Sequence, residues 1–191
     1  HVVGAGVMGG DIAAWCAQRG LTVTLQDQGM ERIAPALQRA YAAWGKRIRD
    51  ARELRNVMDR LIPDPDGHGA RQADVVIEAI FENLEAKLAL LQDLEAKIRS
   101  DAVLATNTSS LRIEDLRSPL TRPERLIGIH FFNPVARMPL VEVVAAEGSD
   151  PEVVQRGIAF VRQIDRLPLP VRSAPGFLVN AVLGPYMLEA M

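Results

Sequence analysis

The chain has 191 residues and a formal net charge of −2, from 22 basic and 24 acidic side chains. Its hydrophobic fraction of 48% and charged fraction of 24% are typical of a globular domain and exclude an intrinsically disordered chain. The balanced charge argues against a dedicated nucleic-acid binder, and no apolar run reaches the roughly 20 residues that a membrane-spanning helix needs. The single cysteine, Cys16, excludes an internal disulfide framework and is typical of a reducing compartment, so we expect a cytoplasmic protein. The three histidines are far apart in sequence and predict no metal site.

Strand-like and helix-like segments alternate along the chain. Short apolar runs predict strands at 1–3, 21–25, 61–62, 75–77, 103–105, 126–131, 140–144 and 167–171. Longer segments predict helices at 7–19, at 30–59 as one or two helices, at 84–98, at 151–164 with Asp150 as N-cap, and at 177–191. Strands that are apolar throughout and separated by helices predict an α/β fold, in which a mostly parallel sheet is covered on both faces.

A glycine-rich loop, Gly4-Ala5-Gly6-Val7-Met8-Gly9, lies between the first predicted strand and the first predicted helix, with the spacing of the dinucleotide fingerprint. In that fingerprint Gly4 permits the tight turn, Gly6 lets the backbone approach a pyrophosphate, and Gly9 allows close helix–strand packing. Asp27 ends the second predicted strand 18 residues after Gly9 (27 − 9), near the ~20 expected of a carboxylate that binds the adenosine ribose. The loop and Asp27 together predict a Rossmann-type, doubly wound domain that binds a dinucleotide. Because a carboxylate there repels the 2′-phosphate of NADP, we expect this dinucleotide to be NAD. The alternative is a glycine-rich turn followed by a capping aspartate.

Two further clusters follow predicted strands, at the sheet edge where ligands bind in doubly wound folds. The first runs from Glu78 to Lys87, and its alternative interpretation is a helix N-terminus, with Glu82 and Lys87 exposed on the helix. The second, Thr106-Asn107-Thr108-Ser109-Ser110, either caps the next helix or offers hydroxyl and amide groups to a ligand.

His130 lies at the end of another predicted strand, beside Phe131 and Phe132. A lone histidine beside aromatic residues is usually structural, but this one falls at the predicted cofactor edge. Hydride removal from an alcohol carbon requires a base for the hydroxyl proton, and histidine titrates near neutral pH. Glu142 lies within the apolar run 140–144, where an acid should have a partner, so it is the candidate to orient the His130 ring.

Taken in order, these motifs resemble the NAD-dependent L-3-hydroxyacyl-CoA dehydrogenases of fatty-acid β-oxidation. The similarity is closest to the dehydrogenase part of bacterial multifunctional fatty-acid oxidation proteins, and it covers nearly the whole chain. Besides the glycine-rich loop, it is carried by Glu78-Ala79-Ile80-Phe81-Glu82-Asn83, Asn107-Thr108-Ser109-Ser110, His130-Phe131-Phe132-Asn133-Pro134, Arg137-Met138-Pro139-Leu140-Val141-Glu142 and Pro175-Gly176-Phe177-Leu178-Val179-Asn180. The resemblance implies oxidation of (S)-3-hydroxyacyl-CoA to 3-oxoacyl-CoA with NAD as hydride acceptor.

The resemblance also implies a role for each matching residue. His130 would be the catalytic base and Glu142 its partner, while Ser109 and Asn180 would hold the C3 oxygen of the substrate. Ser109 and Asn133 would lie near the nicotinamide. The remaining positions that would bind the cofactor are Gly4, Gly6, Met8, Gly9, Asp27, Ile80, Phe81, Glu82, Lys87 and Asn107.

The resemblance divides the chain at Ser173-Ala174-Pro175-Gly176. Residues 1–174 would form the NAD-binding Rossmann domain, and 175–191 would start a truncated, all-α C-terminal domain that completes the substrate cleft and usually forms the dimer. We expect the excised chain to bind NAD but to turn over substrate poorly. Its terminal helix, with apolar surface from Leu178 to Met187, should lie against its own domain, pair with another copy or be poorly ordered. The expected partners are an acyl-CoA substrate and either a second copy or the rest of a multifunctional β-oxidation protein.

Two other functions remain as alternatives. One is a non-catalytic dinucleotide-binding or structural protein, as the lens crystallins related to this family are; the complete set of His130, Glu142, Ser109 and Asn180 argues against it. The other is a β-hydroxyacid dehydrogenase with a catalytic lysine, but none of the lysines lies in a segment that suits this role.

Basic residues are concentrated between Lys46 and Arg60. Lys46, Arg49, Arg52 and Arg55 recur every three residues, which predicts a ridge on one helix. Such a ridge could bind the phosphates of CoA. We favour a solvated helix with ion pairs four residues apart, at Lys46–Asp50, Arg49–Glu53 and Arg55–Asp59.

Overall fold

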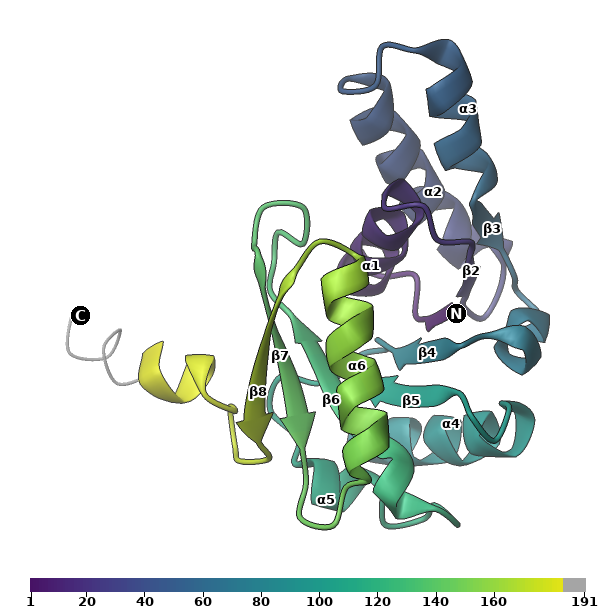
Figure 1. Cartoon of the computed structure of the whole chain (residues 1–191). Helices are drawn as coiled ribbons and strands as arrows, with labels where there is room; N and C mark the ends of the chain where they lie inside the picture. Colours follow the sequence, from purple (N-terminus) through teal and green to yellow (C-terminus); the bar gives the residue numbers. More distant parts are fainter. Residues whose placement is uncertain (184–191) are drawn as a thin grey trace.

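All eight strands belong to one sheet with the order β3-β2-β1-β4-β5-β6-β7-β8 in this computed structural model, which describes residues 1–183 (Figure 1). The strands are β1 (Val2–Val3), β2 (Val23–Gln26), β3 (Leu61–Pro63), β4 (Val75–Glu78), β5 (Val103–Thr106), β6 (Leu126–Phe131), β7 (Leu140–Ala145) and β8 (Leu167–Arg172). Strand order reverses between β1 and β4, so the carboxyl ends of these two strands flank the crevice where doubly wound folds bind ligands.

The sheet is parallel from β3 to β6, and β7 runs antiparallel to β6. Only residues 132–139 connect these two strands, fewer than the dozen or so that a parallel crossover needs. The return to β8 passes through a helix, and β8 is parallel to β7. The expected α/β fold with a mostly parallel, doubly wound sheet is confirmed.

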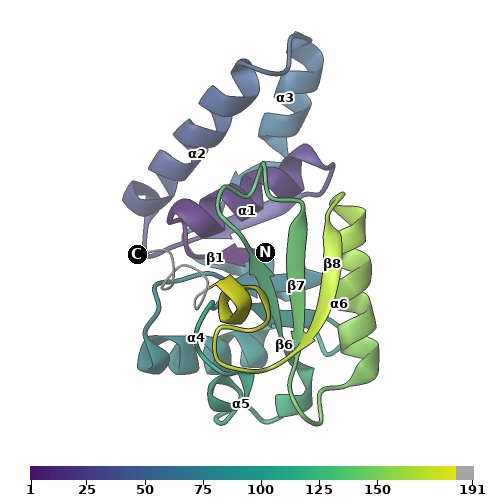
Figure 2. The same ribbon diagram turned by 90° about the vertical axis from the view of Figure 1, so that its left-hand side faces the viewer.

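Alternate strand residues point to opposite faces, and each face has its own apolar core. Ile77, Ile127 and Val143 pack with α1 (Val7–Gln18), α2 (Met30–Gly45) and α6 (Pro151–Gln163). Val76, Leu104 and Val144 pack with α4 (Leu84–Lys97) and α5 (Ile113–Leu116). Figure 2 shows α4 and α6 on opposite sides of the strands.

The helices predicted before residue 173 are present, and α6 begins at the predicted cap. Asp150 caps α6 by accepting a hydrogen bond from the backbone N–H of Glu152, at 2.8 Å. Asn83 caps α4 by accepting from the backbone N–H of Ala86, at 2.9 Å. The short helices that the sequence did not predict are α5 and the 3-10 turns η1 (His68–Gln72) and η2 (Pro123–Arg125), all of five residues or fewer.

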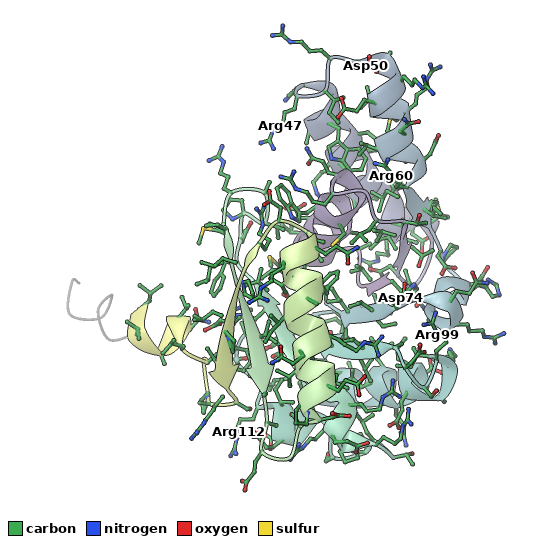
Figure 3. The ribbon with its side chains drawn as sticks, viewed as in Figure 1. Arg47, Asp50, Arg60, Asp74, Arg99 and Arg112 are labelled. Carbon is green, nitrogen blue, oxygen red and sulfur yellow. The ribbon has the colours of Figure 1, made fainter. Side chains whose placement is uncertain are left out.

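The predicted basic ridge is wrong, because the helical segment is broken between Lys46 and Asp50. Helix α2 ends at Gly45 and α3 (Ala51–Asp59) begins after Asp50, which caps it by accepting from the backbone N–H of Glu53 at 2.7 Å. Asp50 is therefore committed to the helix cap, and none of the three expected ion pairs forms within residues 1–183. Figure 3 shows Arg47 and Asp50 at the far end of the α2–α3 pair.

The chain turns sharply after β8. Gly176 and Phe177 both have left-handed backbone conformations, with φ of 72° and 51°, and residues 179–183 are helical. Phe177 is buried against the sheet, whereas Leu178, Val182 and Leu183 are exposed. Figure 2 shows this yellow segment in front of β6 and β7. Phe177 packs against the domain, but the apolar side chains of the helical residues do not, so the three expected outcomes for the terminal helix stay predictions. The rest of the predicted helix, including Met187, lies outside the described residues.

Candidate functional site

The glycine-rich loop joins β1 to α1, and its backbone fits a dinucleotide. Gly4 has a φ of 105°, and a Cβ there would lie 2.5 Å from the carbonyl oxygen of Ala79. A Cβ on Gly9 would lie 1.9 Å from the carbonyl oxygen of Gly4, so the first turn of α1 needs glycine to lie so close to the loop. A Cβ on Gly6 would meet nothing within 4 Å. The space beside Gly6 is therefore open to a ligand, at a helix N-terminus whose N-cap has no side-chain hydrogen bond.

A groove of about 770 Å³ extends from this loop. It is lined by Gly4, Gly6, Asp27, Ile80 and Phe81 of the predicted cofactor residues. Met8 is half-buried and does not line the groove. Gln28, Arg32 and Pro65 complete the wall on the β2 side.

The Asp27 carboxylate is fixed at the end of β2 by two backbone amides. Oδ2 accepts from the N–H of Ala5 and Oδ1 from that of Gln28, each at 2.7 Å. A carboxylate oxygen can accept more than one hydrogen bond, so both oxygens can still accept from ribose hydroxyls in the groove.

Lys87 and two glutamates form a charged cluster beside the groove, which we call the lysine cluster (Glu78, Glu82 and Lys87). Glu78 and Lys87 are buried, whereas the Glu82 side chain is 35% exposed. The ammonium Nζ of Lys87 lies 2.6 Å from Glu78 Oε1 and 3.3 Å from Glu82 Oε2, and it donates to the carbonyl oxygen of Ile80. The Lys87 side chain is 1% exposed. The alternative in which Lys87 is exposed on the helix is therefore wrong, and the described conformation directs its charge at the glutamates.

Glu82 connects this cluster to the loop 106–110. Its Oε1 accepts from the hydroxyls of Thr108 and Ser110 and from the backbone N–H groups of Ser109 and Ser110. Burial alone would raise the pKa of Glu82, but hydrogen bonds from Thr108 and Ser110 and the Lys87 ammonium outweigh it and lower the pKa to about 2. The carboxylate that holds the Ser109 loop is therefore ionised at neutral pH.

Glu78 is the residue of this region that the sequence reasoning missed. It is fully buried at the end of β4, and it accepts from Lys87, from the N–H of Ile80 and from the hydroxyl of Thr106. The signal was present, because an acid that ends an apolar strand should have a partner. Glu142, an acid within an apolar strand, carries the same signal.

His130 and Glu142 are directly opposite each other in the antiparallel pair β6–β7. His130 Nδ1 lies 2.8 Å from Glu142 Oε2, and the two side chains are 6% and 0% exposed. A carboxylate only accepts hydrogen bonds, so in the neutral ring Nδ1 carries the proton and Nε2 has a free lone pair. Within residues 1–183 Nε2 makes no hydrogen bond. The rings of Phe132 and Phe177 flank the imidazole, at centroid distances of 4.5 and 5.6 Å.

The remaining predicted residues occupy different surroundings. Asn107 joins two strands, because its side-chain oxygen accepts from the N–H of Phe131 at 2.9 Å. Ser109, Asn133 and Asn180 are exposed, and none of their side chains hydrogen-bonds to His130 in the described part of the chain. The segment that carries Asn180 is connected to the site through the backbone, since Glu142 Oε1 accepts from the N–H groups of Leu178 and Val179. No sequence signal indicated this contact.

No helix within residues 1–183 combines the length and hydropathy that a membrane crossing requires.

Solved structures of several dehydrogenases align with 99% of this chain, and these include the following three. The 3-hydroxybutyryl-CoA dehydrogenase of Escherichia coli is 37% identical with a TM-score of 0.94, and 41% of it is covered. The (S)-3-hydroxybutyryl-CoA dehydrogenase PaaH1 of Ralstonia eutropha is 31% identical with a TM-score of 0.90, and 68% is covered. A 5-formyl-3-hydroxy-2-methylpyridine 4-carboxylic acid 5-dehydrogenase, an NAD+-dependent dismutase, is 32% identical with a TM-score of 0.84, and 62% is covered.

The chain thus spans between about two fifths and two thirds of these relatives. The sequence model of a single family, the NAD-binding domain of 3-hydroxyacyl-CoA dehydrogenases, matches residues 1–174. That range contains the glycine-rich loop, the groove and the His130–Glu142 pair. The chain belongs to this family of NAD-binding domains.

Proposed function

We propose that the protein oxidises (S)-3-hydroxyacyl-CoA to 3-oxoacyl-CoA with NAD, as a step of fatty-acid β-oxidation. The observation that carries the proposal is the buried His130–Glu142 pair at the same sheet edge as the glycine-rich loop. A non-catalytic dinucleotide-binding protein has no need of an imidazole whose Nδ1 is held by a carboxylate while its Nε2 remains available to accept a proton.

His130 would act through Nε2. Glu142 holds the proton on Nδ1 and would stabilise the imidazolium after Nε2 takes the hydroxyl proton of the substrate. The flanking rings of Phe132 and Phe177 keep water away from the imidazole and restrict its rotation. In the reverse direction the imidazolium would return this proton to the oxygen of the 3-oxo group.

The residues of the groove fit NAD. Gly6 leaves room for a pyrophosphate, and Asp27 presents a fixed carboxylate to the ribose hydroxyls. When bound, NAD supplies the hydride acceptor. Asp27 would also repel a 2′-phosphate, which favours NAD over NADP.

Ser109 and Asn180 are our candidates to bind the C3 oxygen. Ser109 lies on the loop that Glu82 holds in place, and Asn180 follows the amide groups that Glu142 binds. Their exposure leaves both available to a substrate. We further propose that residues from 175 onward begin a helical domain that completes the cleft, and that the acyl-CoA contacts come in part from it.

The test is hydride transfer between NADH and acetoacetyl-CoA, followed by the absorbance of the reduced nicotinamide. Acetoacetate without CoA and an aromatic aldehyde are the comparison substrates, and NADPH is the comparison cofactor. We expect activity with NADH and acetoacetyl-CoA and much less with each replacement. Binding of NADH without transfer, even with the chain in stoichiometric excess and after extension through a helical domain, would support the non-catalytic alternative.

A further inference from the structure

Glu142 uses its two carboxylate oxygens for two different elements of the molecule. Oε2 binds His130 Nδ1 on β6, at 2.8 Å. Oε1 accepts from the backbone N–H of Leu178 at 3.0 Å and from that of Val179 at 2.9 Å. The carboxylate is fully buried, so these contacts are its whole hydrogen-bonding environment within residues 1–183.

The two amide groups belong to a segment whose path is set by the backbone before it. The left-handed conformations of Gly176 and Phe177 reverse the chain, and Phe177 is buried with its ring edge-on to His130. Leu178 and Val179 then open the helical residues, whose first N–H groups have no partner within the helix. A carboxylate that accepts from both satisfies them and also gains from their partial positive charge.

Sharing one carboxylate links the two elements mechanically. If the segment at 177–179 moved away, Oε1 would lose two donors. A buried carboxylate without these donors is destabilised unless other groups donate to it. The carboxylate would then rotate and carry Oε2 away from the optimum for Nδ1. Conversely, a segment that stays bound fixes the Glu142 side chain, and with it the imidazole.

We propose that Glu142 is a positioning residue for two groups at once: it orients His130 and it anchors the backbone immediately before Asn180. One carboxylate then sets the placement of the proton acceptor relative to the segment that carries a predicted substrate residue. The roles of His130 and Asn180 in catalysis rest on the proposed function, whereas the anchoring of Leu178 and Val179 does not.

The first test is amide hydrogen exchange measured by NMR at Leu178 and Val179, with the amide of Ile77 in the central sheet as the reference for global opening. In Glu142→Ala both amides should exchange about tenfold faster or more relative to Ile77, because they lose a charged acceptor. In Glu142→Gln the side-chain oxygen still accepts, so protection should be largely retained. Unchanged exchange at Leu178 and Val179 in Glu142→Ala would overturn the proposal.

Glu142→Gln also separates the two roles. The amide group that it introduces can donate to Nδ1 of His130, so the ring should change to the tautomer protonated at Nε2. The nitrogen chemical shifts of His130 report this change. If the Glu142→Gln variant kept the Nδ1-protonated tautomer, Glu142 would not be the residue that orients the ring.

A second pair of variants tests the link from the segment to the histidine and leaves the carboxylate in place. Val179→Pro removes one of the two N–H donors at the first helical position, where proline is tolerated, and Val179→Ala removes only the side-chain methyl groups. Val179→Pro should displace the His130 Nδ1 resonance and Val179→Ala should not. Equal spectra for the two variants would mean that the segment and the imidazole are independent.

None of these measurements requires turnover. Absence of hydride transfer to acetoacetyl-CoA, also after extension through a helical domain, would overturn the proposed function and leave the anchoring measurable. Loss of the coupled responses would overturn the anchoring and leave the proposed function untouched.

Discussion

Two carboxylate clusters lie at the same edge of the sheet, and they are built in different ways. In the lysine cluster one ammonium lies between two glutamates, and hydroxyl and amide donors from the loop 106–110 complete the set. In the second cluster Glu142 has no lysine or arginine partner within residues 1–183. Its partners are the imidazole of His130 and two backbone N–H groups.

This difference indicates different tasks. In the lysine cluster an ammonium lies between two carboxylates that also accept hydrogen bonds from hydroxyl groups, so the geometry of the cluster is fixed. A carboxylate whose main partner is histidine becomes better balanced when that histidine takes a proton. The lysine cluster is therefore a scaffold for the cofactor side of the site, and the Glu142 cluster is suited to proton transfer.

Removal of the His130 imidazole should have the largest effect on turnover. A small effect would contradict the different tasks that we assign to the two clusters. We expect His130→Ala to lower kcat for acetoacetyl-CoA reduction by about 10² to 10⁴, the range for loss of a general base. NADH affinity should stay nearly constant, because His130 does not line the groove. His68→Ala, at an exposed histidine, is the matched control. Full turnover by the His130 variant would make the histidine structural.

Loss of the lysine cluster's cation should instead reduce stability. Lys87→Met leaves Glu78 buried without its ammonium partner, which should lower the free energy of unfolding by about 3 to 5 kcal/mol. Lys97→Met removes an exposed partner of Asp93 four residues away, worth about 0.3 to 0.5 kcal/mol. Chemical denaturation of both variants measures the difference. Similar losses for the two lysines would contradict the role of Lys87 as a buried counterion.

Asp27 variants test how the groove distinguishes NAD from NADP. Asp27→Ala should weaken NAD binding by about tenfold to a hundredfold, as expected for hydrogen bonds to a charged group, and should narrow the preference over NADP. Asp27→Asn retains an acceptor for Ala5 and removes the charge, so it should relieve repulsion of NADP with a smaller loss of NAD affinity. Calorimetric titration with both cofactors gives these values. Equal affinity of the unmodified protein for NAD and NADP would refute the assignment.

The smallest expected effect is that of Glu82 on the free energy of unfolding at acid pH. The pKa of Glu82 falls from 4.5 to about 2 in the folded protein, so its ionised form stabilises the fold above about pH 4.5. That contribution is lost as the pH falls from about 4.5 towards 2. Glu82→Gln should therefore lose less stability over this interval than the unmodified protein. Glu85→Gln, at an exposed glutamate, should follow the unmodified protein in urea unfolding at each pH.

Much of the fold could be predicted because its signals are local. Apolar runs, the spacing of glycines and the capping residue Asp150 each depend on a few neighbouring positions. The predicted basic ridge was wrong because the three-residue spacing of the basic side chains was given more weight than the capping pattern at Asp50. Asp50 followed by Glu53 is a capping pattern that begins α3, so Lys46 and Arg49 lie before this helix and cannot share a ridge with Arg52 and Arg55.

The site divides in the same way. The His130–Glu142 pair could be predicted, because an acid in an apolar strand and a histidine at a sheet edge are both visible in the sequence. The burial of Lys87 could not, since a lysine in the first turn of a helix is ordinarily solvated. The amides of Leu178 and Val179 were equally hidden, because backbone donors are present at every position and only the turn at Gly176 directs these two to Glu142.

The position of Glu142 opposite His130 also bears on how the β6–β7 pair finds its correct alignment during folding. Side chains alternate between the two faces of a strand, so a slip of one residue would turn Glu142 toward the opposite core, which contains Val141 and Val143 and is otherwise apolar. A charge buried there would have neither the imidazole nor the amides as partners, an outcome that destabilises by several kcal/mol. The misaligned state is thus disfavoured by the same side chain that serves the site. The alternation of side chains along β7, rather than the length of the connection 132–139, therefore determines which face of the sheet carries the Glu142 carboxylate.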